Sequence, residues 1–453
     1  MQLSLQTPLK EQLDGSISPC LASSFDVVTD PTNPSVTLHL QKGVKFQDGS
    51  DWNAKALKWN YDKIIASKMY PNVTNYWKSL EILDDYTIRI NMTTWLNKSL
   101  GSFGNSVSYM VSPTAFDKNG IDWMRWNMVG TGAYIQSDFQ RDVSLTTTRN
   151  ANYWEQGKPY LDKMQYLFVA DEMTRVALFK SGGGEILNTN ANGRIALDFQ
   201  SAGYKILSQP SGTTILVPDS LNTDSPWSNL KVRQAADYAI DREAIAKTFG
   251  YGFWTANYQL SEPTSAAFDK TIPGRKFDVA KAKQLLSEAG YPNGFKTTLI
   301  AQDTFNRDIV ATIQSYLKQV GIQCEIQTVQ QAKYTTYSFT SATWNNAIII
   351  GTQTAWANPT TGLNGSFGIP STSWVSTAKP DGWKEALTAA MVSPKLEPAL
   401  VQKVEHMAYD FAMVIPVYSS MAMWVVDPKV QDSGLGTRGA SQWWEPQNTW
   451  LSK

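Results

Sequence analysis

The stretch Leu38-His-Leu-Gln-Lys-Gly-Val-Lys-Phe-Gln-Asp-Gly49 is the part of the sequence in which local structure is easiest to recognise. Apolar and polar side chains alternate from Val36 to Leu40, and this period of two predicts a strand. Gly43 and the pair Asp48-Gly49 come next, and both favour turns. A helix is expected after Asn53, because asparagine caps helices well and the apolar residues beyond it recur at helical spacing.

The same signals continue along the chain. Ser79–Met92 alternates around an Asp-Asp pair and predicts a hairpin. Asp278 is expected to cap a helix that ends before Gly290. Residues 309–320 have helical spacing, and residues 322–326 alternate as a strand directly afterwards. Helix, glycine and strand in this order indicate an α/β layer structure.

Two later regions are harder to assign. From Trp344 to Trp383 the periodicity disappears in favour of glycine, proline and small polar residues, which predicts a long loop of functional importance. Val414–Tyr418 and Met423–Val426 are apolar enough to form two further strands.

Length and charge restrict the class of protein. A chain of 453 residues is too long for one compact core, so at least two lobes with a cleft between them are expected. Forty basic and forty acidic residues cancel, which argues against a nucleic-acid partner and against an anionic membrane surface. The longest apolar stretches are far too short to span a bilayer.

The sequence lacks the usual signs of catalysis. Only two histidines are present, His39 within the predicted strand and His406 within a helical pattern, so neither is expected to be catalytic. Metal-ligand spacing is absent, and no cofactor or metal is expected. Cys20 and Cys324 are expected to be buried thiols. Because forty carboxylates offer many pairs, a tryptophan-rich carbohydrate hydrolase stays open as the enzymatic alternative.

Several motifs resemble the bacterial solute-binding proteins of family 5, the oligopeptide, dipeptide and nickel binders of ABC transporters. The resemblance is strongest at Leu38–Gly49 and continues in family order across nearly the whole chain. The other matching segments are Gly130–Tyr134, Arg149–Trp154, Val232–Ile245 and Ala282–Pro292.

This resemblance implies an α/β, two-lobed periplasmic-binding-protein type II fold with an extra α+β accessory domain. Residues 1–128 would form the accessory domain, residues 129–214 with 430–453 lobe one, and residues 215–429 lobe two. The hinge would lie near Thr213–Asn222 and again near Val426–Asp432. Relatives also begin with an export signal and a first strand of lobe one that have no counterpart here, so we expect this sequence to be a piece of a longer chain.

The function implied by the resemblance is capture of an extracytoplasmic peptide in an aromatic-lined cleft and its delivery to a membrane permease, without enzymatic activity. The expected partners are the ABC permease and ATPase subunits, and the protein is expected to be a monomer. Its expected location is periplasmic, or extracellular and membrane-associated as a lipoprotein. An oligosaccharide-binding protein of the same family is the alternative.

The long loop supplies the first candidate ligand contacts, Trp356 and Asn358, because aromatic rings stack on ligands in clefts. Peptide-binding relatives often carry an aspartate in the corresponding loop, and its absence here favours a neutral ligand such as an oligosaccharide. Six further residues complete the predicted ligand-binding set: Asn222, Trp227, Trp254, Tyr258, Trp374 and Trp383.

Overall fold

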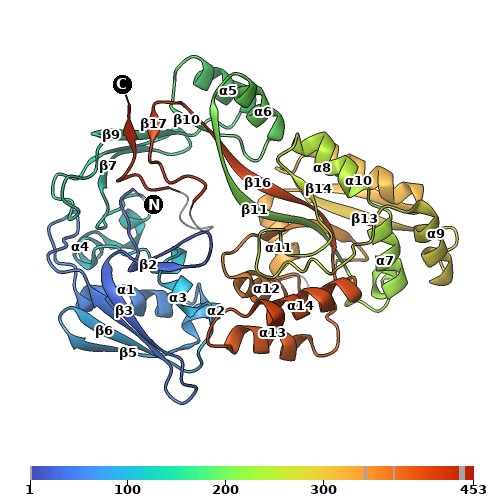
Figure 1. The fold of residues 1–453 in the computed structure, drawn as a ribbon, viewed down its shortest axis with the longest axis horizontal. Helices are drawn as coiled ribbons and strands as arrows, with labels where there is room; N and C mark the ends of the chain where they lie inside the picture. Colours follow the sequence, from blue (N-terminus) through green and yellow to red (C-terminus); the bar gives the residue numbers. More distant parts are fainter. Residues whose placement is uncertain (1–2, 341–343, 371–372, 438–443, 453) are drawn as a thin grey trace.

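The computed structural model describes residues 3–340, 344–370, 373–437 and 444–452. Its largest sheet has seven strands in the order β10-β16-β11-β15-β13-β14, with β12 paired to β16 at one side. Figure 1 shows this sheet running from the upper part of the molecule into the right-hand part. Its strands are β10 (Ile186–Asn188), β11 (Lys205–Pro218), β12 (Thr255–Ala256), β13 (Phe295–Gln302), β14 (Ile322–Val329), β15 (Ile348–Thr354) and β16 (Ile415–Val426).

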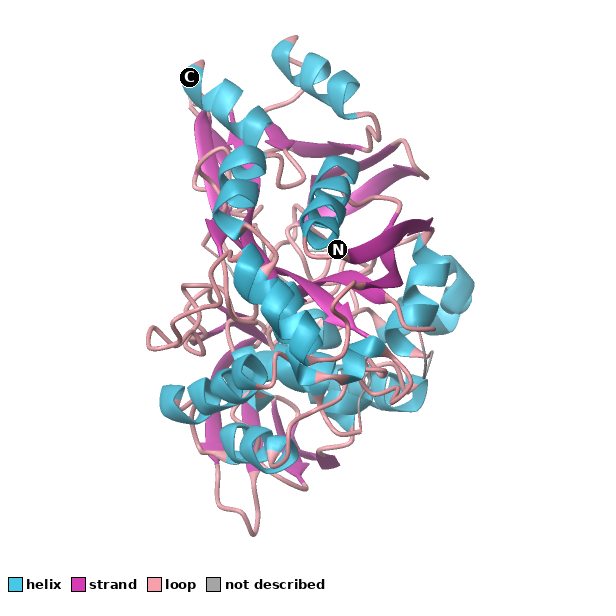
Figure 2. Ribbon diagram, turned by 90° about the vertical axis from the view of Figure 1, so that its right-hand side faces the viewer, coloured by secondary structure: helices cyan, strands magenta, loops and turns pink. Residues whose placement is uncertain are grey.

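Helices cover both faces of the large sheet within predicted lobe two, as Figure 2 shows from that side of the molecule. Successive side chains of each strand point alternately into two apolar cores, one on each face of the sheet. Leu216 and Ile350 face one core, whereas Ile215, Val217 and Ile349 face the other. Strands buried on both faces are typical of an α/β layer structure. Helices α7 (Leu230–Tyr238), α8 (Arg242–Gly250), α9 (Val279–Glu288) and α10 (Arg307–Gln319) pack on the first core, and α11 (Gln331–Phe339), α12 (Pro359–Phe367), α13 (Trp383–Val392) and α14 (Pro398–Asp410) on the second.

The predicted accessory domain contains a four-stranded antiparallel sheet in the order β3-β4-β6-β5. The strand expected at 36–40, the hairpin at 79–92 and the Asn53 cap are all confirmed; the Asn53 side chain accepts a 3.0 Å hydrogen bond from the Ala56 amide. The elements of this part are β3 (Ala22–Val28), β4 (Ser35–Leu40), α1 (Ala54–Ser67), α2 (Pro71–Thr74), β5 (Trp77–Asp84), β6 (Thr87–Met92), α3 (Ser99–Ser102), η1 (Ser106–Ser108) and α4 (Pro113–Met124).

Predicted lobe one consists of a three-stranded sheet, two helices and short strand pairs. The N-terminal residues join it, because the Gly132 amide donates to the Ser4 carbonyl (2.9 Å) and the Tyr134 amide to the Leu3 carbonyl (3.0 Å). The N-terminal segment contributes the strand pair β1 (Leu9–Glu11) and β2 (Ile17–Pro19). The elements of predicted lobe one are β7 (Tyr134–Gln140), β8 (Ser144–Arg149), β9 (Lys163–Leu167), α5 (Glu172–Lys180), α6 (Gly193–Ser201), β17 (Val430–Gln431) and β18 (Trp450–Leu451), together with β10.

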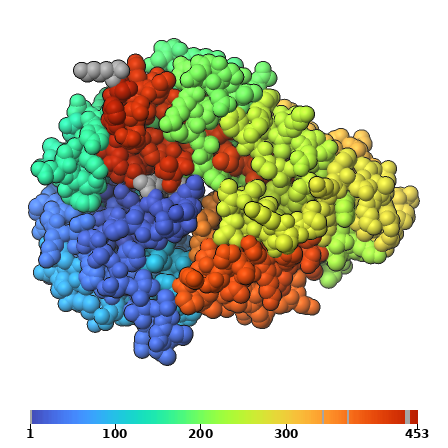
Figure 3. Space-filling model, in the orientation of Figure 1, coloured from blue at the N-terminus to red at the C-terminus, as the bar shows by residue number. Residues whose placement is uncertain are grey.

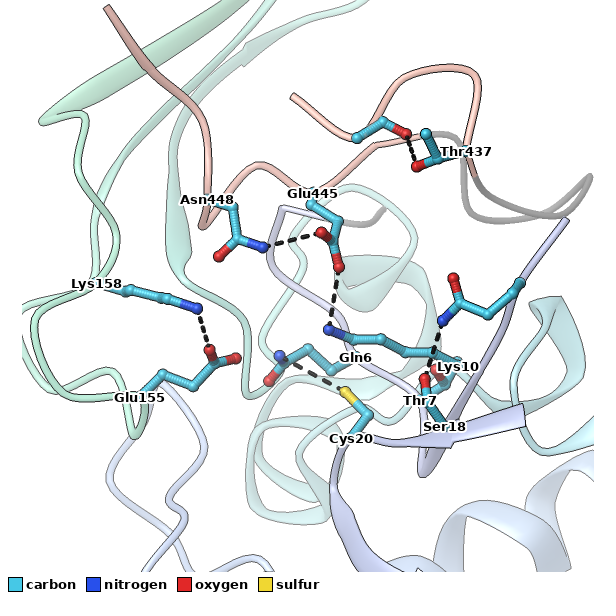
Figure 4. A network of polar contacts seen from close by, with 12 residues as sticks. Gln6, Thr7, Lys10, Ser18, Cys20, Glu155, Lys158, Thr437, Glu445 and Asn448 are labelled. Carbon is cyan, nitrogen blue, oxygen red and sulfur yellow. Dashed lines mark hydrogen bonds and ion pairs between the residues drawn. The ribbon is translucent and has the colours of Figure 1, made fainter. Parts of the chain in front are cut away.

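A polar network also fastens the N-terminal segment to lobe one. The Lys10 ammonium lies 3.5 Å from a Glu445 carboxylate oxygen, and Asn448 donates to the other oxygen of Glu445 at 2.9 Å (Figure 4). At the left of Figure 4, Lys158 and Glu155 of lobe one form an ion pair of 2.8 Å. The accessory domain is therefore attached to lobe one by both backbone and side-chain contacts.

Strands β11 and β16 form one antiparallel ribbon that passes between the lobes. Pairing extends from Lys205↔Val426 to Leu216↔Ile415, with register shifts near Gly212 and Thr214. Along β16 the apolar core changes between Tyr418, which packs in lobe two, and Trp424, which packs with the C-terminal segment. The second crossing therefore lies earlier in the chain than the predicted 426–432.

Two expectations about local structure were wrong. The region from Trp344 to Trp383 is not one long loop, because it contains β15 and α12. The two strands expected at 414–418 and 423–426 are one continuous strand, β16. Ser419 and Ser420 interrupt the apolar pattern of β16, yet both pair with β11 through their backbone, for which side-chain polarity is irrelevant.

Candidate functional site

The region where the ribbon passes between the lobes is organised by a buried asparagine, Asn257. Its amide nitrogen donates to the hydroxyl oxygens of Thr213 on β11 and Ser419 on β16, each at 2.9 Å, and to the Ser261 carbonyl at 2.8 Å. The two hydroxyl groups are 3.1 Å apart and buried. This cluster therefore fixes the two strands relative to each other at the crossing.

The loop that follows β15 lies beside this crossing, because Thr354 at the end of β15 pairs with Gly212 of β11. β15 also runs parallel to β13, and β13 to β14. In open α/β sheets, ligands bind outside the carboxyl ends of parallel strands. Trp356, two residues beyond β15, is half-buried there. A Cβ at Gly362 would lie 2.8 Å from Cδ1 of Trp356, so the indole packs closely on the first turns of α12.

Asn358 has its polar atoms occupied by protein. Its side-chain oxygen caps α12 by accepting from the Thr360 amide at 3.0 Å, and its amide nitrogen donates to the Asn97 side-chain oxygen at 2.9 Å. Asn97 belongs to the accessory domain. The loop also meets the β1–β2 turn, where a Cβ at Gly15 would lie 3.4 Å from the Ala357 carbonyl oxygen.

Trp254 lies at the same level of the ribbon as the β15 loop. Its ring stacks on Tyr418 with a centroid distance of 4.3 Å and an interplanar angle of 4°. The indole nitrogen is buried and has no hydrogen-bond partner among the described residues. Tyr258, four residues further on, lies over the Arg242 guanidinium at 4.9 Å and donates to Glu243 at 3.4 Å, so it packs against lobe two.

Three predicted tryptophans are core residues, and the prediction that they face a cleft needs correction. Trp227, Trp374 and Trp383 are 0%, 6% and 1% exposed. Indole nitrogens of two of them bond to protein carbonyls, Trp227 to that of Asn346 and Trp383 to that of Phe367. Tryptophan carries a large apolar surface, so a count of tryptophans does not distinguish a core from a cleft.

Asn222 is also far from the crossing. β11 continues without a break to Pro218, and five residues of strand beyond Thr213 cover about 17 Å. Asn222 then bonds weakly to Asp219 and Asn346, both at 3.4 Å. Of the range 213–222 in which the hinge was expected, Thr213 lies at the crossing, whereas Asn222 lies at the far end of lobe two.

Figure 3 shows the molecular surface indented between the blue N-terminal part of the chain and the yellow part of lobe two. On the lobe-one side of the ribbon lies a cavity of about 1210 Å³, bounded by β9 and β10, which are edge strands of their sheets. None of the eight predicted ligand-binding residues lines it. Its aromatic lining consists of Trp126, Phe139, Tyr166, Phe168, Phe179, Trp424 and Trp444.

Three buried ionisable groups lie near the junctions between parts of the molecule. Burial raises the pKa of Glu11 to about 7 and lowers the pKa of Lys98 to about 8. The Lys98 ammonium has no hydrogen-bond partner among the described residues. Burial also raises the pKa of Glu405 to about 7, against the opposing effect of hydrogen bonds from Ser261 and Leu260. Glu405 thereby holds the segment that follows Asn257.

Glu405 is expected to make stability depend on pH. Its pKa rises from 4.5 to about 7 on folding, so between these values the folded protein keeps a proton that the unfolded chain has lost. The free energy of unfolding should therefore fall by roughly 2–3 kcal/mol from this group as pH rises from about 4.5 to about 7. Glu405→Gln should remove this fall, measured by urea unfolding across that range.

The matched control is Glu385→Gln, since Glu385 is exposed on α13. That variant should follow the wild-type pH dependence. The pKa of Glu11 is raised as well, so Glu11 adds to the pH dependence of the wild-type protein. The contribution of Glu405 is therefore the difference in the free energy of unfolding between variant and wild type at each pH. Equal slopes for Glu405→Gln and wild type would contradict the assignment.

Within the described residues, no group of three or more histidine, cysteine, aspartate or glutamate side chains is arranged to hold a metal ion. Cys20 and Cys324 are buried free thiols, as expected. Among the described helices, none combines the length and apolarity needed to cross a bilayer. The crossing region therefore offers hydrogen-bonding groups and aromatic surface.

Two α/β lobes joined by a long β-ribbon, with an accessory domain attached to one of them, define the class of two-lobed solute-binding proteins. The family model described as bacterial extracellular solute-binding proteins, family 5 Middle, matches residues 16–372. The chain belongs to this family. The resemblance found in the sequence motifs is thereby confirmed.

Curated relatives and solved structures agree with this assignment. The glutathione-binding protein GsiB of Salmonella choleraesuis (strain SC-B67) is 31% identical over 319 residues, which are 69% of this chain and 61% of the relative. GsiB of Escherichia coli O157:H7 is 31% identical over 312 residues, 68% of this chain and 60% of the relative. The chain thus aligns with less than two thirds of the length of these relatives.

Solved structures match almost the whole chain. DppA from Helicobacter pylori, in complex with the peptide STSA, superposes with a TM-score of 0.84 at 23% identity and covers 100% of this chain and 93% of its own. NikA from Brucella suis, in complex with Fe(III)-EDTA, gives a TM-score of 0.85 at 22% identity, with 99% and 94% coverage. These likenesses confirm the predicted α/β type II periplasmic-binding-protein fold.

Proposed function

We propose that this chain is the substrate-binding component of an ABC importer and that it captures a peptide between lobe one and lobe two. The observation that carries the proposal is the β11–β16 ribbon, which joins two separate apolar cores in a member of solute-binding family 5. A ribbon of this kind allows hinge closure about a ligand. No covalent step is involved, so the chain is not an enzyme.

The peptide class is supported by the named relatives. DppA from Helicobacter pylori was solved with the peptide STSA. A dipeptide-binding protein from Pseudoalteromonas sp. SM9913 was solved with Met-Leu. It superposes on this chain with a TM-score of 0.83 at 19% identity and covers 100% of this chain and 95% of its own. Glutathione, which GsiB binds, is itself a tripeptide. The oligosaccharide alternative rests on the tryptophans and on the missing aspartate; three of the predicted tryptophans are core residues, which weakens the first of these two grounds.

The ligand-facing residues in this proposal are those that lie at the crossing. Trp356 and Trp254 supply aromatic surface on lobe two, and the unpartnered indole nitrogen of Trp254 can donate a hydrogen bond. The Lys98 ammonium, also without a partner, can pair with a ligand carboxylate that reaches it. Asn358 acts through the loop conformation, since its side chain is already bonded.

The moving units follow the apolar cores. Residues 1–128 and 129–214, with the C-terminal segment, form one body, and residues from 215 to about Ser420 form the other. The loaded protein docks as a monomer on the permease of the importer, which is driven by its ATPase subunits. This places it on the extracytoplasmic side of the membrane.

Thermal-shift measurements with STSA, Met-Leu, glutathione, maltotriose and Ni²⁺ test the proposal. A peptide at 100 times its dissociation constant should add about 2.7 kcal/mol to the free energy of unfolding, because it binds the folded state only. We expect a shift with at least one of the three peptides and none with maltotriose or Ni²⁺. A shift with maltotriose alone would replace peptide by oligosaccharide, and hydrolysis of it would make the chain a glycosidase.

Trp356→Ala tests the site within the same screen. It should abolish the peptide shift while leaving the unliganded midpoint nearly unchanged, since the ring is only half-buried. Trp123→Ala, which removes an indole that is 39% exposed on α4, should keep the shift. An equal peptide shift in both variants would exclude Trp356 as a ligand contact.

A further inference from the structure

Several accessory-domain residues touch lobe two, among them Tyr76 and the β1–β2 turn at Gly15. The hydrogen-bonded contact is the short segment Trp95–Asn97, which follows β6. The Trp95 indole donates to the Pro394 carbonyl at 3.0 Å, and the Asn97 backbone amide donates to the Met391 carbonyl at 2.9 Å. Both acceptors lie at the end of α13 in lobe two. Figure 1 shows the accessory domain meeting lobe two at the end of α13. Residues nearly 300 positions apart in sequence are thus joined here.

Leu96 occupies the apolar core of lobe two. Its side chain is 3% exposed and packs in the cluster that includes Leu363, Phe367 and Met391. Leu96 is therefore an accessory-domain residue whose burial depends on lobe two being in place. Removing it from that cluster would expose a leucine side chain, at a cost of about 1.5–3 kcal/mol.

The Asn97 side chain connects this contact to the β15 loop. Its amide nitrogen donates to the Ala390 carbonyl at 2.6 Å and to the Ser393 hydroxyl at 3.1 Å. Its oxygen accepts from Asn358 at 2.9 Å and from the Thr360 hydroxyl at 3.3 Å. Asn97 thus satisfies its hydrogen-bonding capacity entirely with lobe two, on both α13 and the start of α12.

The rest of the accessory domain is held by lobe one. The Gln47 amide donates to the Gly132 and Tyr134 carbonyls at 3.1 and 2.8 Å, and the Ser4 hydroxyl donates to Tyr134 at 2.7 Å. A body made of lobe one and the accessory domain therefore reaches lobe two through the ribbon and through contacts between separate parts of the chain, among them Trp95–Asn97 and the packing of Gly193 on α6 against Gly250 on α8. The ribbon is continuous chain, whereas the Trp95–Asn97 contact can separate.

We propose that Trp95–Asn97 is a latch by which the accessory domain holds the lobes closed and that Asn97 is a positioning residue for the Trp356–Asn358 loop. The proposal rests on the proposed function, since a latch has meaning only if the lobes open. Opening withdraws Leu96 from the lobe-two core and releases Asn358. Closing restores both, so the loop takes its ligand-facing form only when the latch engages.

Labelled variants test the latch directly. Dyes at Asp122→Cys in the accessory domain and Lys283→Cys on α9 report lobe closure by energy transfer, and the two natural cysteines are buried and stay unlabelled. Asn97→Ala should lower the closed fraction, with and without STSA, roughly tenfold relative to the open one, since four partly buried hydrogen bonds are lost. Hydrogen exchange at the Thr360 amide should become faster in parallel.

Asn91→Ala is the matched control, because the side chain of Asn91 on β6 bonds only to Ser79 among the described residues and lies within the same domain. It should close like the wild type. Leu96→Ala should open the protein as Asn97→Ala does, which guards against a folding defect in one variant. If the closed fraction is unchanged in both Asn97→Ala and Leu96→Ala, the latch proposal is wrong while the proposed function stands. A single, constant distance in the wild type would instead overturn the proposed function together with the latch.

Discussion

Replacing Arg242 by alanine should lower the free energy of unfolding by about 3–5 kcal/mol, because it removes one partner of a buried ion pair. Arg242 and Asp237 are in direct contact, with side chains 0% and 4% exposed. The guanidinium also donates to the carbonyls of Pro416 on β16 (2.7 Å) and Arg275 (3.2 Å). Alanine would leave these acceptors without the donor that now satisfies them. Urea unfolding at neutral pH measures the loss.

Arg125→Ala supplies the matched control for this prediction. Arg125 pairs with Asp122 at 2.9 Å, but both side chains are more than 60% exposed. Pairs of this kind contribute about 0–1 kcal/mol in water. A loss for Arg242→Ala no greater than that for Arg125→Ala would show that the network at α8 is dispensable. Asp237→Asn should reproduce much of the Arg242 effect, since Arg275 also depends on this carboxylate.

Trp227→Ala should destabilise lobe two by about 3–5 kcal/mol and should act on stability, not on ligand recognition. The ring is 0% exposed and meets Phe295 edge-on at 5.3 Å. Its indole nitrogen donates to the Thr297 hydroxyl at 3.1 Å and to the Asn346 carbonyl at 3.0 Å. Alanine would leave a cavity next to two acceptors that have lost a donor. Thermal and urea unfolding provide the measurement.

Trp227→Phe separates packing from hydrogen bonding at the same site. It keeps most of the apolar volume and loses only the indole N–H, so a loss of about 1–3 kcal/mol is expected. Neither variant should change the affinity for a peptide once the protein is folded. A folded Trp227→Ala protein of native stability but weakened peptide binding would restore the ligand-contact role that the sequence first indicated.

Local elements of the fold were predictable because their signals are local. Asn53 and Asp278 cap helices through hydrogen bonds to amides three residues away, and such motifs are visible in a short window of sequence. The continuity of β16 was missed for a related reason. Ser419 and Ser420 look like a break in a short window, whereas their pairing with β11 depends on a strand two hundred residues away.

The candidate site was predictable only in part. Trp356 lies half-buried beside the crossing, in the loop that the family resemblance singled out, and its role as a ligand contact stays a prediction. Trp374 and Trp383 are core residues, which the sequence could not show, since an aromatic side chain has the same identity in a core and in a cleft. Asn257 and Asn97 escaped notice because their partners are distant in sequence, and a lone asparagine carries no pattern. Such residues become visible only when the chain is folded.

The β11–β16 ribbon has a consequence for the speed of ligand exchange. The register shifts near Gly212 and Thr214 are the irregular points at which an antiparallel ribbon can bend while the pairing on either side of them is kept. Hinge motions of this kind occur in microseconds to milliseconds. Under the proposed function, the residence time of a bound solute should therefore depend on the surfaces that meet across the gap more than on the strands that connect them.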